Sequence, residues 1–143
     1  MQKTISIIIA IFNRKDELFE LLNSLIAQTD KNFEVIIVDD GSSVDLLPTV
    51  ETFKEMLEIQ YFKKTNSGPG LSRNYGARRA KNDWLVFVES DVIVEKDYIE
   101  NNKKNLENTD CAAFGGADKA HKGFNILQKA ISYSMTSVFT TGG

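Results

Sequence analysis

A chain of 143 residues with a net charge of −3, 26% charged residues and 42% hydrophobic residues resembles an ordinary soluble globular protein with room for one core. This balance and its scattered basic pairs argue against a nucleic-acid surface, and a single cysteine excludes a disulfide framework or thiolate metal site. The apolar run at residues 5–12 is too short to cross a bilayer. We expect a single domain over residues 1–143, located in the cytoplasm or at the inner face of the membrane.

Two kinds of apolar segment alternate along the chain. Continuous β-branched runs predict buried strands, and apolar residues at helical spacing predict amphipathic helices. In chain order, we predict a strand at Ile5–Ile11, a helix at 15–28, a strand at 33–38, a short helix begun by Pro48, a strand at 59–62, a helix through Leu71, Tyr75 and Ala80, a strand at 84–88, a helix at 98–106, a strand at 111–114 and a closing helix at 127–138. The alternation predicts an α/β fold with a mostly parallel sheet and helices on both faces.

Polar side chains follow three of the predicted strands. These clusters are Asn13-Arg14 after the first strand, Asp39-Asp40 after the second, and Glu89-Ser90-Asp91 after the fourth. Ligands of parallel α/β sheets bind beyond the carboxyl ends of the strands. The sequence therefore predicts a binding site at this edge.

The pair Asp39 and Asp40 has two interpretations. Asp, Gly and Ser dominate turns, so the segment could be only the exit turn of a strand. A short acid at a strand end can also accept hydrogen bonds from a ribose or a base edge. Both interpretations remain open at this point, although a doubled aspartate exceeds what a turn needs.

Glu89 and Asp91 interrupt an apolar run, where two acids repel each other and lose hydration unless a cation is near. One alternative is that Asp91 or Glu95 caps the next helix. An acid-x-acid pair also suits Mg²⁺ or Mn²⁺, which take one or two protein carboxylates and complete their shell with water and substrate phosphates. We therefore predict a cation at Glu89 and Asp91 that arrives with a diphosphate.

The sequence NSGPG at residues 66–70 is the strongest loop signal, but it matches neither a P-loop nor a dinucleotide fingerprint. Arg73 follows it on the first turn of a predicted helix, where it could pair with a phosphate or a nucleotide carbonyl. These residues alone favour an ordinary loop with a solvated Arg73 over that ligand role. His121 is the only histidine and has no nucleophile signature beside it, so we do not expect a histidine-based triad.

Taken in order, these segments resemble the family 2 glycosyltransferases, which have the nucleotide-sugar-binding GT-A fold. Four stretches carry the resemblance: SIIIAIFNRKDELFELLNSLIAQT (6–29), FEVIIVDDGSS (33–43), NSGPGLSRNYGA (66–77) and WLVFVESDVIV (84–94). Members transfer a sugar from a nucleotide-sugar donor to an acceptor hydroxyl, usually with a divalent metal and with inversion. The resemblance implies a Mn²⁺ or Mg²⁺ cofactor, a nucleotide-sugar donor (by family habit a UDP-sugar), and a saccharide or lipid-linked acceptor.

The resemblance also implies roles for the nucleotide-binding positions. Ala10 and Phe12 would line the nucleotide pocket. Asp40 would accept hydrogen bonds from the base, with Asp39 beside it. Arg73 would contact the base or the phosphates.

Glu89 and Asp91 would be the acidic DxD pair of the family, with Asp91 as the main metal ligand and Glu89 nearer the ribose or sugar. Glu89 departs from the usual first Asp, since its arm is longer. The catalytic base of the family, an acid well downstream and often in a Glu-Asp pair, has no counterpart after Asp91. We expect it beyond Gly143, in a longer enzyme of which this chain is an amino-terminal piece that turns over slowly or not at all.

Two other functions remain open from the sequence. A nucleotidyltransferase also binds a nucleotide and a metal, but it would need a glycine-rich basic loop after the first strand, and AIFNRKDE at residues 10–17 lacks glycine. A catalytically incompetent nucleotide-binding or scaffold fragment would keep the fold without the reaction.

Overall fold

The computed structural model describes residues 4–110 and 112–115. The chain divides into two compact units, Met1–Thr109 and Asp110–Gly143, and every helix and strand given below belongs to the first. No helix within the described residues is long and apolar enough to span a membrane. The predicted closing helix and His121 lie outside the described residues.

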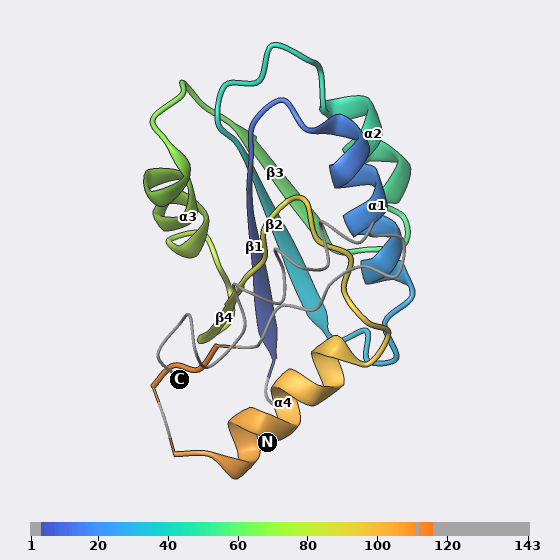
Figure 1. The fold of residues 1–143 in the computed structure, drawn as a ribbon, viewed down its shortest axis with the longest axis vertical. Coiled ribbons are helices and arrows are strands. Elements are labelled where there is room, and N and C mark those ends of the chain that lie inside the picture. The colour runs from blue at the N-terminus through green and yellow to red at the C-terminus, as the bar shows by residue number, and fades with distance from the viewer. Residues whose placement is uncertain (1–3, 111, 116–143) are drawn as a thin grey trace, which may run out of the picture. The chain divides into compact units, whose positions relative to one another are not determined.

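Within the described part of the first unit, four helices and four strands alternate along the chain (Figure 1). They are β1 (Ile5–Ile11), α1 (Lys15–Ile26), β2 (Phe33–Asp39), α2 (Leu47–Phe53), β3 (Ile59–Lys63), α3 (Pro69–Ala77), β4 (Trp84–Phe87) and α4 (Tyr98–Asn108). The strands form one parallel sheet in the order β3-β2-β1-β4. The predicted α/β fold with a parallel sheet is therefore confirmed.

Two separate cores bury the two faces of the sheet. In Figure 1, α1 and α2 lie on one side of the sheet and α3 lies on the other. The larger core joins alternate residues of β1 to apolar residues of α1, α2 and α4, among them Ile5, Ile7, Ile9, Leu18, Leu22, Val50, Ile99 and Leu106. The smaller core, under α3, contains Ile8, Ile36 and Val38, with Phe62 and Tyr75 packed against it.

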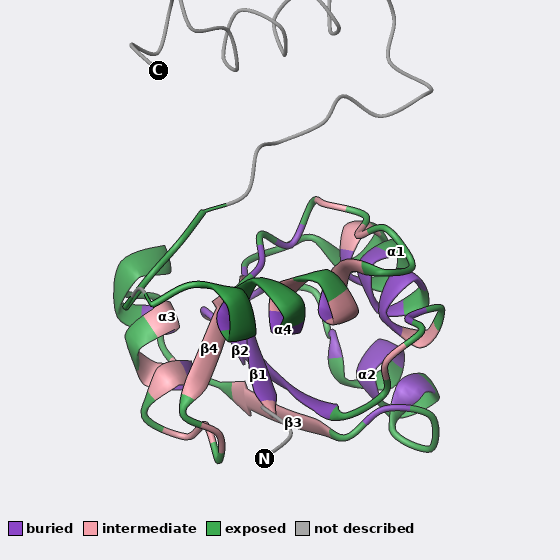
Figure 2. Cartoon of the chain, turned by 90° about the horizontal axis from the view of Figure 1, so that it is seen from below, coloured by how far each residue is buried: buried purple, intermediate pink, exposed green. Residues whose placement is uncertain are grey.

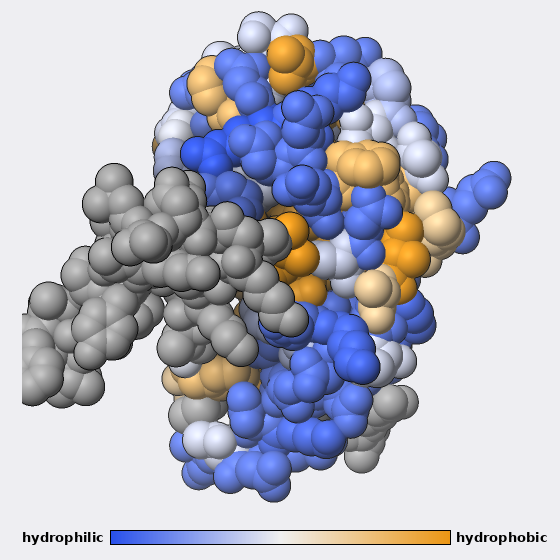
Figure 3. Space-filling model, turned by 45° about the vertical axis from the view of Figure 1, so that its right-hand side comes forward, coloured by the Kyte–Doolittle hydropathy of each residue, from blue (hydrophilic) through white to orange (hydrophobic). Residues whose placement is uncertain are grey.

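Burial follows this layering. β1 and β2 are buried along nearly their whole length, whereas β3 and β4 at the two edges are only partly buried (Figure 2). The face shown in Figure 3 is mainly hydrophilic, with smaller apolar groups between the polar ones. The continuous β-branched runs of β1 and β2 are thus explained by helices on both faces of the sheet.

Helix α3 packs on the sheet differently from the prediction. Leu71 was expected on its inner face but is exposed, and Ser72 and Gly76 are the buried residues of this helix. A Cβ atom at Gly76 would lie 2.7 Å from Cγ2 of Ile8. Small residues therefore face the sheet because the backbone of the helix approaches it closely. The helix also ends at Ala77, before Ala80.

Two further expectations need correction. Helix α1 ends at Ile26 rather than at residue 28. The strand predicted at 111–114 is wrong for the part that is described, since residues 112–115 are exposed and irregular. A short apolar run becomes a strand only where a neighbouring strand can pair with it, and periodicity alone does not supply one.

Candidate functional site

A pocket of about 270 Å³ lies beyond the carboxyl ends of β1 and β4. Its lining comes from the end of β1 and the residues after it, the exit of β2, the start of α3 and the exit of β4: Ala10, Ile11, Phe12, Arg14, Asp40, Pro69, Glu89, Ser90 and Asp91. Successive strands β1, β2 and β3 extend the sheet in one direction, and β4 adds to the other side of β1. The pocket therefore sits at the topological switch point, where ligands of open α/β sheets bind.

The register of the sheet explains why distant residues meet here. Ile8 pairs with Phe87, and the N–H of Val88 donates to the carbonyl of Ile8 at 3.1 Å. Strand β1 continues to Ile11, so the segment after β4 runs beside the last residues of β1. The structure thus brings together Asp40 and the acids that follow β4, as the sequence predicted for this edge of the sheet.

Asp40 is a buried carboxylate that also holds a loop in place. Its Oδ1 accepts the backbone N–H of Ser67 at 2.9 Å and an ion pair from Lys64, and its Oδ2 accepts the backbone N–H of Gly68 at 2.8 Å. Burial opposes ionisation, but these hydrogen bonds, with that from Lys64 foremost, lower the pKa of Asp40 below its usual value. Lys64, Ser67 and Gly68 thus take three of the about four acceptor positions of this carboxylate, and the nearby Ser72 hydroxyl also lowers its pKa.

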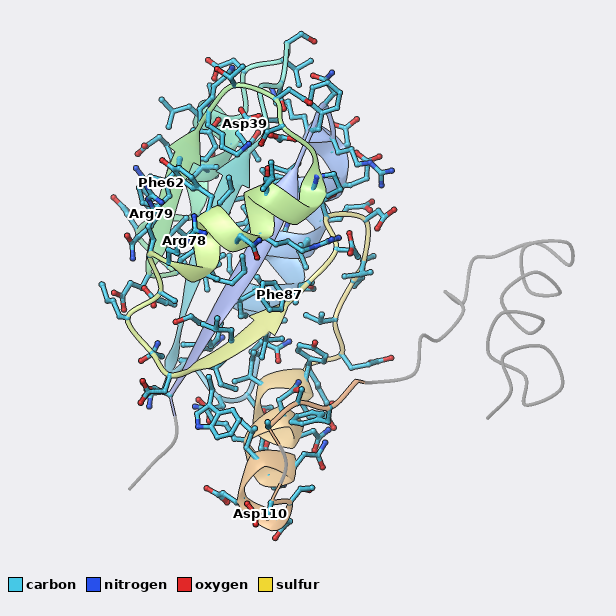
Figure 4. The ribbon with its side chains drawn as sticks, turned by 90° about the vertical axis from the view of Figure 1, so that its left-hand side faces the viewer. Asp39, Phe62, Arg78, Arg79, Phe87 and Asp110 are labelled. Atoms are coloured by element: carbon cyan, nitrogen blue, oxygen red, sulfur yellow. The ribbon has the colours of Figure 1, made fainter. Side chains whose placement is uncertain are left out.

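Asp39 faces a different direction from Asp40. Its side chain is fully buried, its Oδ1 accepts the backbone N–H of Ser42 at 2.8 Å, and its Oδ2 accepts the hydroxyl of Tyr61 at 2.7 Å. Burial, together with this hydrogen bond to the carboxylate, raises the pKa of Tyr61. Asp39 does not line the pocket, although it lies at the carboxyl edge of the sheet (Figure 4). Asp39 therefore stabilises the turn after β2, whereas Asp40 lines the pocket.

The loops above the pocket are joined to each other through Asn13. This residue has a φ of 55°, in the left-handed region that Asn tolerates better than most residues. Its backbone N–H donates to the Ser42 hydroxyl at 2.9 Å, and its side-chain oxygen accepts the backbone N–H of Ser43 at 2.8 Å. These bonds fix the exits of β1 and β2 relative to each other.

Glu89 and Asp91 each form an ion pair with an arginine from another element. Asp91 pairs with Arg14, which precedes α1, and Glu89 pairs with Arg73 on α3. The side chain of Glu89 is 63% exposed and that of Asp91 is 50% exposed, so both carboxylates can reach a ligand. Neither acid caps a helix, because Asp97 occupies the N-cap position of α4. Exposure to water and pairing with arginines offset the free-energy cost of placing two acids at the end of a strand.

The acidic pair fits a cation that is shared with a ligand. Among residues 4–110 and 112–115, no three His, Cys, Asp or Glu side chains cluster closely enough to hold a metal ion by themselves. Glu89 and Asp91 nonetheless line one pocket and offer oxygen ligands. Magnesium and manganese commonly bind through one or two protein carboxylates and complete their shell with substrate phosphates and water. The donor set matches that mode.

Apolar groups form another part of the pocket wall. Phe12 is 48% exposed at the end of β1, and Ala10 and Pro69 also line the pocket. A half-exposed aromatic ring beside a buried carboxylate suits a flat ligand that has both apolar faces and polar edges. Ala10 and Phe12 thus line this pocket, whereas Arg73 is not part of its lining and contacts the site through its ion pair with Glu89.

The sequence prediction gave no individual role to two residues of this site. Arg14 lines the pocket, and Lys64 joins Asp40 to the hydroxyl of Ser67. Arg14 had a signal, since it lies in the polar cluster directly after β1. Lys64 had none beyond its charge, because its contact with Asp40 depends on the pairing of β2 with β3.

A second pocket, of about 200 Å³, lies at the opposite end of the sheet, near the beginnings of β1 and β2. Glu34 lines it and is buried, but its oxygens already accept hydrogen bonds from Ser6 at 2.6 Å, Gln60 at 2.9 Å and the backbone N–H of Lys81 at 2.7 Å. The amino ends of parallel strands are also not where such sheets bind ligands. We therefore assign the functional site to the first pocket.

Comparisons with known proteins agree with this assignment. A family model described as glycosyl transferase family 2 matches residues 6–140. An uncharacterized glycosyltransferase of Rickettsia conorii is 40% identical over 103 residues, which cover 72% of this chain and 17% of the relative. The poly(ribitol-phosphate) β-N-acetylglucosaminyltransferase TarS of Staphylococcus aureus strain Mu50 is 39% identical over 113 residues, which cover 76% of this chain and 18% of TarS.

The fold comparison points the same way. The crystal structure of S. aureus TarS 1–349 in complex with UDP matches with a TM-score of 0.69 at 33% identity, covering 73% of this chain and 32% of that one. The TarS 1–349 structure with UDP-GlcNAc matches with a TM-score of 0.68 at 32% identity, covering 73% and 31%. The chain spans 17% and 18% of the length of the two relatives compared by sequence. Its sheet has the GT-A fold, and the chain belongs to glycosyl transferase family 2.

Proposed function

We propose that this chain binds a nucleotide-diphosphate sugar, with a UDP-sugar as the first candidate, in the pocket between β1 and β4. In the complete enzyme, the sugar would pass to the hydroxyl of a saccharide or lipid-linked acceptor with inversion. The observation that carries the proposal is the convergence of Asp40, Glu89 and Asp91 on one pocket with an apolar wall. The UDP and UDP-GlcNAc complexes of TarS, about a third identical to this chain, support the choice of donor.

The nucleoside would occupy the end of the pocket formed by Asp40 and Phe12. Asp40 is ionised, buried and held in place by the backbone of residues 67 and 68, and it lines the pocket. It would accept a hydrogen bond from the base, and Phe12 and Ala10 would contact the flat faces of the nucleoside. Asp39 would support this arrangement from the turn without touching the ligand.

The diphosphate would lie toward the exit of β4, near Glu89, Asp91 and Arg73. We propose that Glu89 and Asp91 hold Mg²⁺ or Mn²⁺, which when bound would neutralise the charge that grows on the departing nucleoside diphosphate. Arg73 lies within reach of the same place through its pair with Glu89, and a guanidinium matches the geometry of a phosphate.

The transfer itself would be a direct displacement at the anomeric carbon by the acceptor oxygen. A carboxylate would remove the acceptor proton, a contribution typically of about 10²–10⁴-fold in rate. We place this base outside the described residues, because the carboxylates that line the pocket already have nucleotide-binding or cation-binding roles. A location in the cytoplasm or at the inner membrane face would give access to nucleotide sugars.

Isothermal titration of the full chain with UDP, in the presence of Mn²⁺ and then of a chelator, tests the proposal. We expect saturable binding that requires Mn²⁺ or Mg²⁺, and weaker binding of GDP and ADP. Absence of binding, or binding that ignores the metal, would favour a scaffold fragment. Release of pyrophosphate from UTP and a sugar phosphate would instead identify a nucleotidyltransferase.

A further inference from the structure

We infer that Arg14 is an exchangeable counter-ion of the donor site. In the free chain it neutralises Asp91, and when a divalent cation binds that carboxylate the guanidinium transfers to the phosphates of the donor. The inference rests on the proposed function and adds to it a phosphate-binding residue and an order of events. Arg14 has no such role in the sequence prediction.

The position of Arg14 provides the geometric basis. It follows β1, occupies the residue before α1, and lines the same pocket as Asp91, with which it forms an ion pair across 77 positions of sequence. Its side chain is 45% exposed. A side chain in this place can turn within the pocket without unpacking any core residue.

The charges of the pocket explain why the pair should exchange. Each lining carboxylate has a cation of its own: Lys64 pairs with Asp40, Arg73 with Glu89 and Arg14 with Asp91. A divalent cation on Glu89 and Asp91 would take over the neutralisation of both acids. The same cation repels a guanidinium at close range, so Arg14 would leave Asp91.

The freed guanidinium would still lie at the pocket, where the expected ligand carries a diphosphate. Arginine binds phosphate through two parallel N–H donors, which is a stronger and more directional contact than lysine makes. An ion pair between half-exposed groups contributes little to stability, so breaking it opposes cation binding only weakly. Exchange is therefore favourable when both metal and donor are present.

Replacement of Arg14 by Gln, measured in two separate titrations of the full chain, tests the inference. In the first, with Mn²⁺ alone, Arg14→Gln should bind the metal about two- to fivefold more tightly than the wild type, because a competing cation has been removed. In the second, with UDP at saturating Mn²⁺, the variant should bind about tenfold or more weakly, because a charged contact to phosphate is lost. Tighter binding of Mn²⁺ together with weaker binding of UDP in this one variant would indicate exchange.

Two matched variants make the test specific. Arg14→Lys should restore competition with Mn²⁺ but recover only part of the UDP affinity, since an ammonium lacks the paired donors. Arg78→Gln removes the same charge from an exposed position at the other end of α3 and should change neither titration. All variants should unfold at the wild-type temperature, and a large loss of stability in both Arg14 variants would contradict a weakly held pair.

The outcomes separate this inference from the proposed function. A wild-type chain that does not bind UDP with Mn²⁺ would overturn the proposed function and this inference with it. If the wild type binds UDP, an Arg14→Gln variant with unchanged UDP affinity would overturn the phosphate role alone. An unchanged or weaker affinity for Mn²⁺ alone would overturn the exchange.

Discussion

The backbone N–H of Gly68, at the start of α3, donates a 2.8 Å hydrogen bond to Oδ2 of Asp40, at the exit of β2. The neighbouring N–H of Ser67 donates to Oδ1 of the same carboxylate at 2.9 Å. One side chain therefore fixes the glycine loop and also forms part of the pocket. Stability and ligand binding should depend on it together.

Replacement of Asp40 by Asn tests this double role. The amide keeps the shape but loses the negative charge that accepts from two backbone donors and from Lys64. We expect a loss of about 1.5–3 kcal/mol in the free energy of unfolding, measured by urea denaturation at pH 7. Asp83→Asn, at an exposed position, should change stability by no more than about 0.5 kcal/mol and serves as the control.

Acid should weaken the fold partly through Asp40. Because the pKa of this group is lowered in the folded chain, its stabilisation is complete above the unfolded aspartate pKa of about 4 and is lost as the pH falls through the lowered folded value. Urea denaturation between neutral and acid pH should show a smaller acid-induced loss for Asp40→Asn than for the wild type. Identical pH profiles would refute a stabilising carboxylate here.

Close packing of α3 on the sheet predicts opposite effects at two glycines of one helix. A Cβ at Gly76 would lie 2.7 Å from Ile8 Cγ2 and 3.2 Å from Val38 Cγ2, whereas a Cβ at Gly70 would have no neighbour within 4 Å. We expect Gly76→Ala to destabilise the chain by about 1–3 kcal/mol through overpacking. Gly70→Ala should be neutral or stabilise it by up to about 1 kcal/mol. Thermal denaturation of both variants would show whether this difference exists.

Two adjacent lysines of α4 should differ in the same manner. Lys103 is buried and donates to both carboxylate oxygens of Asp30, at 2.8 and 2.7 Å, and to the carbonyl of Asn32 at 2.9 Å. Lys103→Met leaves a mostly buried carboxylate unpaired and should cost about 2–4 kcal/mol. Lys104→Met breaks only the exposed pair with Glu100 and should cost no more than about 0.5 kcal/mol. Equal losses on chemical denaturation would mean that burial does not decide the strength of these pairs.

Strands β1 and β2 were predictable because burial on both faces leaves a direct trace in sequence. The β-branched runs of these two strands carry this trace. The positions of Asp40 and Asp91 directly after strands could also be read from the sequence. The shared pocket of Asp40 and Asp91 also followed, since parallel strands present their carboxyl ends at one edge.

Other features depend on contacts between strands and helices that the sequence alone does not reveal. Asp39 and Asp40 are neighbours, yet only their places in the sheet decide that the first bonds to Tyr61 and the second lines the pocket. The inner face of α3 was predicted wrongly. Hydrophobicity alone favours Leu71 at the sheet, but the close approach of the helix leaves room only for a small residue such as Gly76.

Long-range side-chain pairs were the least accessible to prediction. Arg79 shows this just after α3, where its guanidinium carbon lies 3.4 Å from the ring centre of Tyr75 and 4.9 Å from that of Phe62 on β3; Figure 4 labels Arg79 and Phe62. Tyr75 and Arg79 are four residues apart in the chain, but only the packing of α3 against the sheet brings them to Phe62. The pairing of Arg14 with Asp91 has the same origin.

The binding of UDP to the Asp91→Asn variant at fixed Mn²⁺ tests the central claim most directly. Titration of this variant, of Glu95→Gln as an exposed acid in the same loop, and of the wild type compares equal changes of charge in and outside the pocket. We predict that Asp91→Asn lowers the UDP affinity at least about tenfold and abolishes its dependence on Mn²⁺, while Glu95→Gln matches the wild type. Metal-dependent binding of wild-type strength in Asp91→Asn would contradict a cation-assisted donor site at the exit of β4.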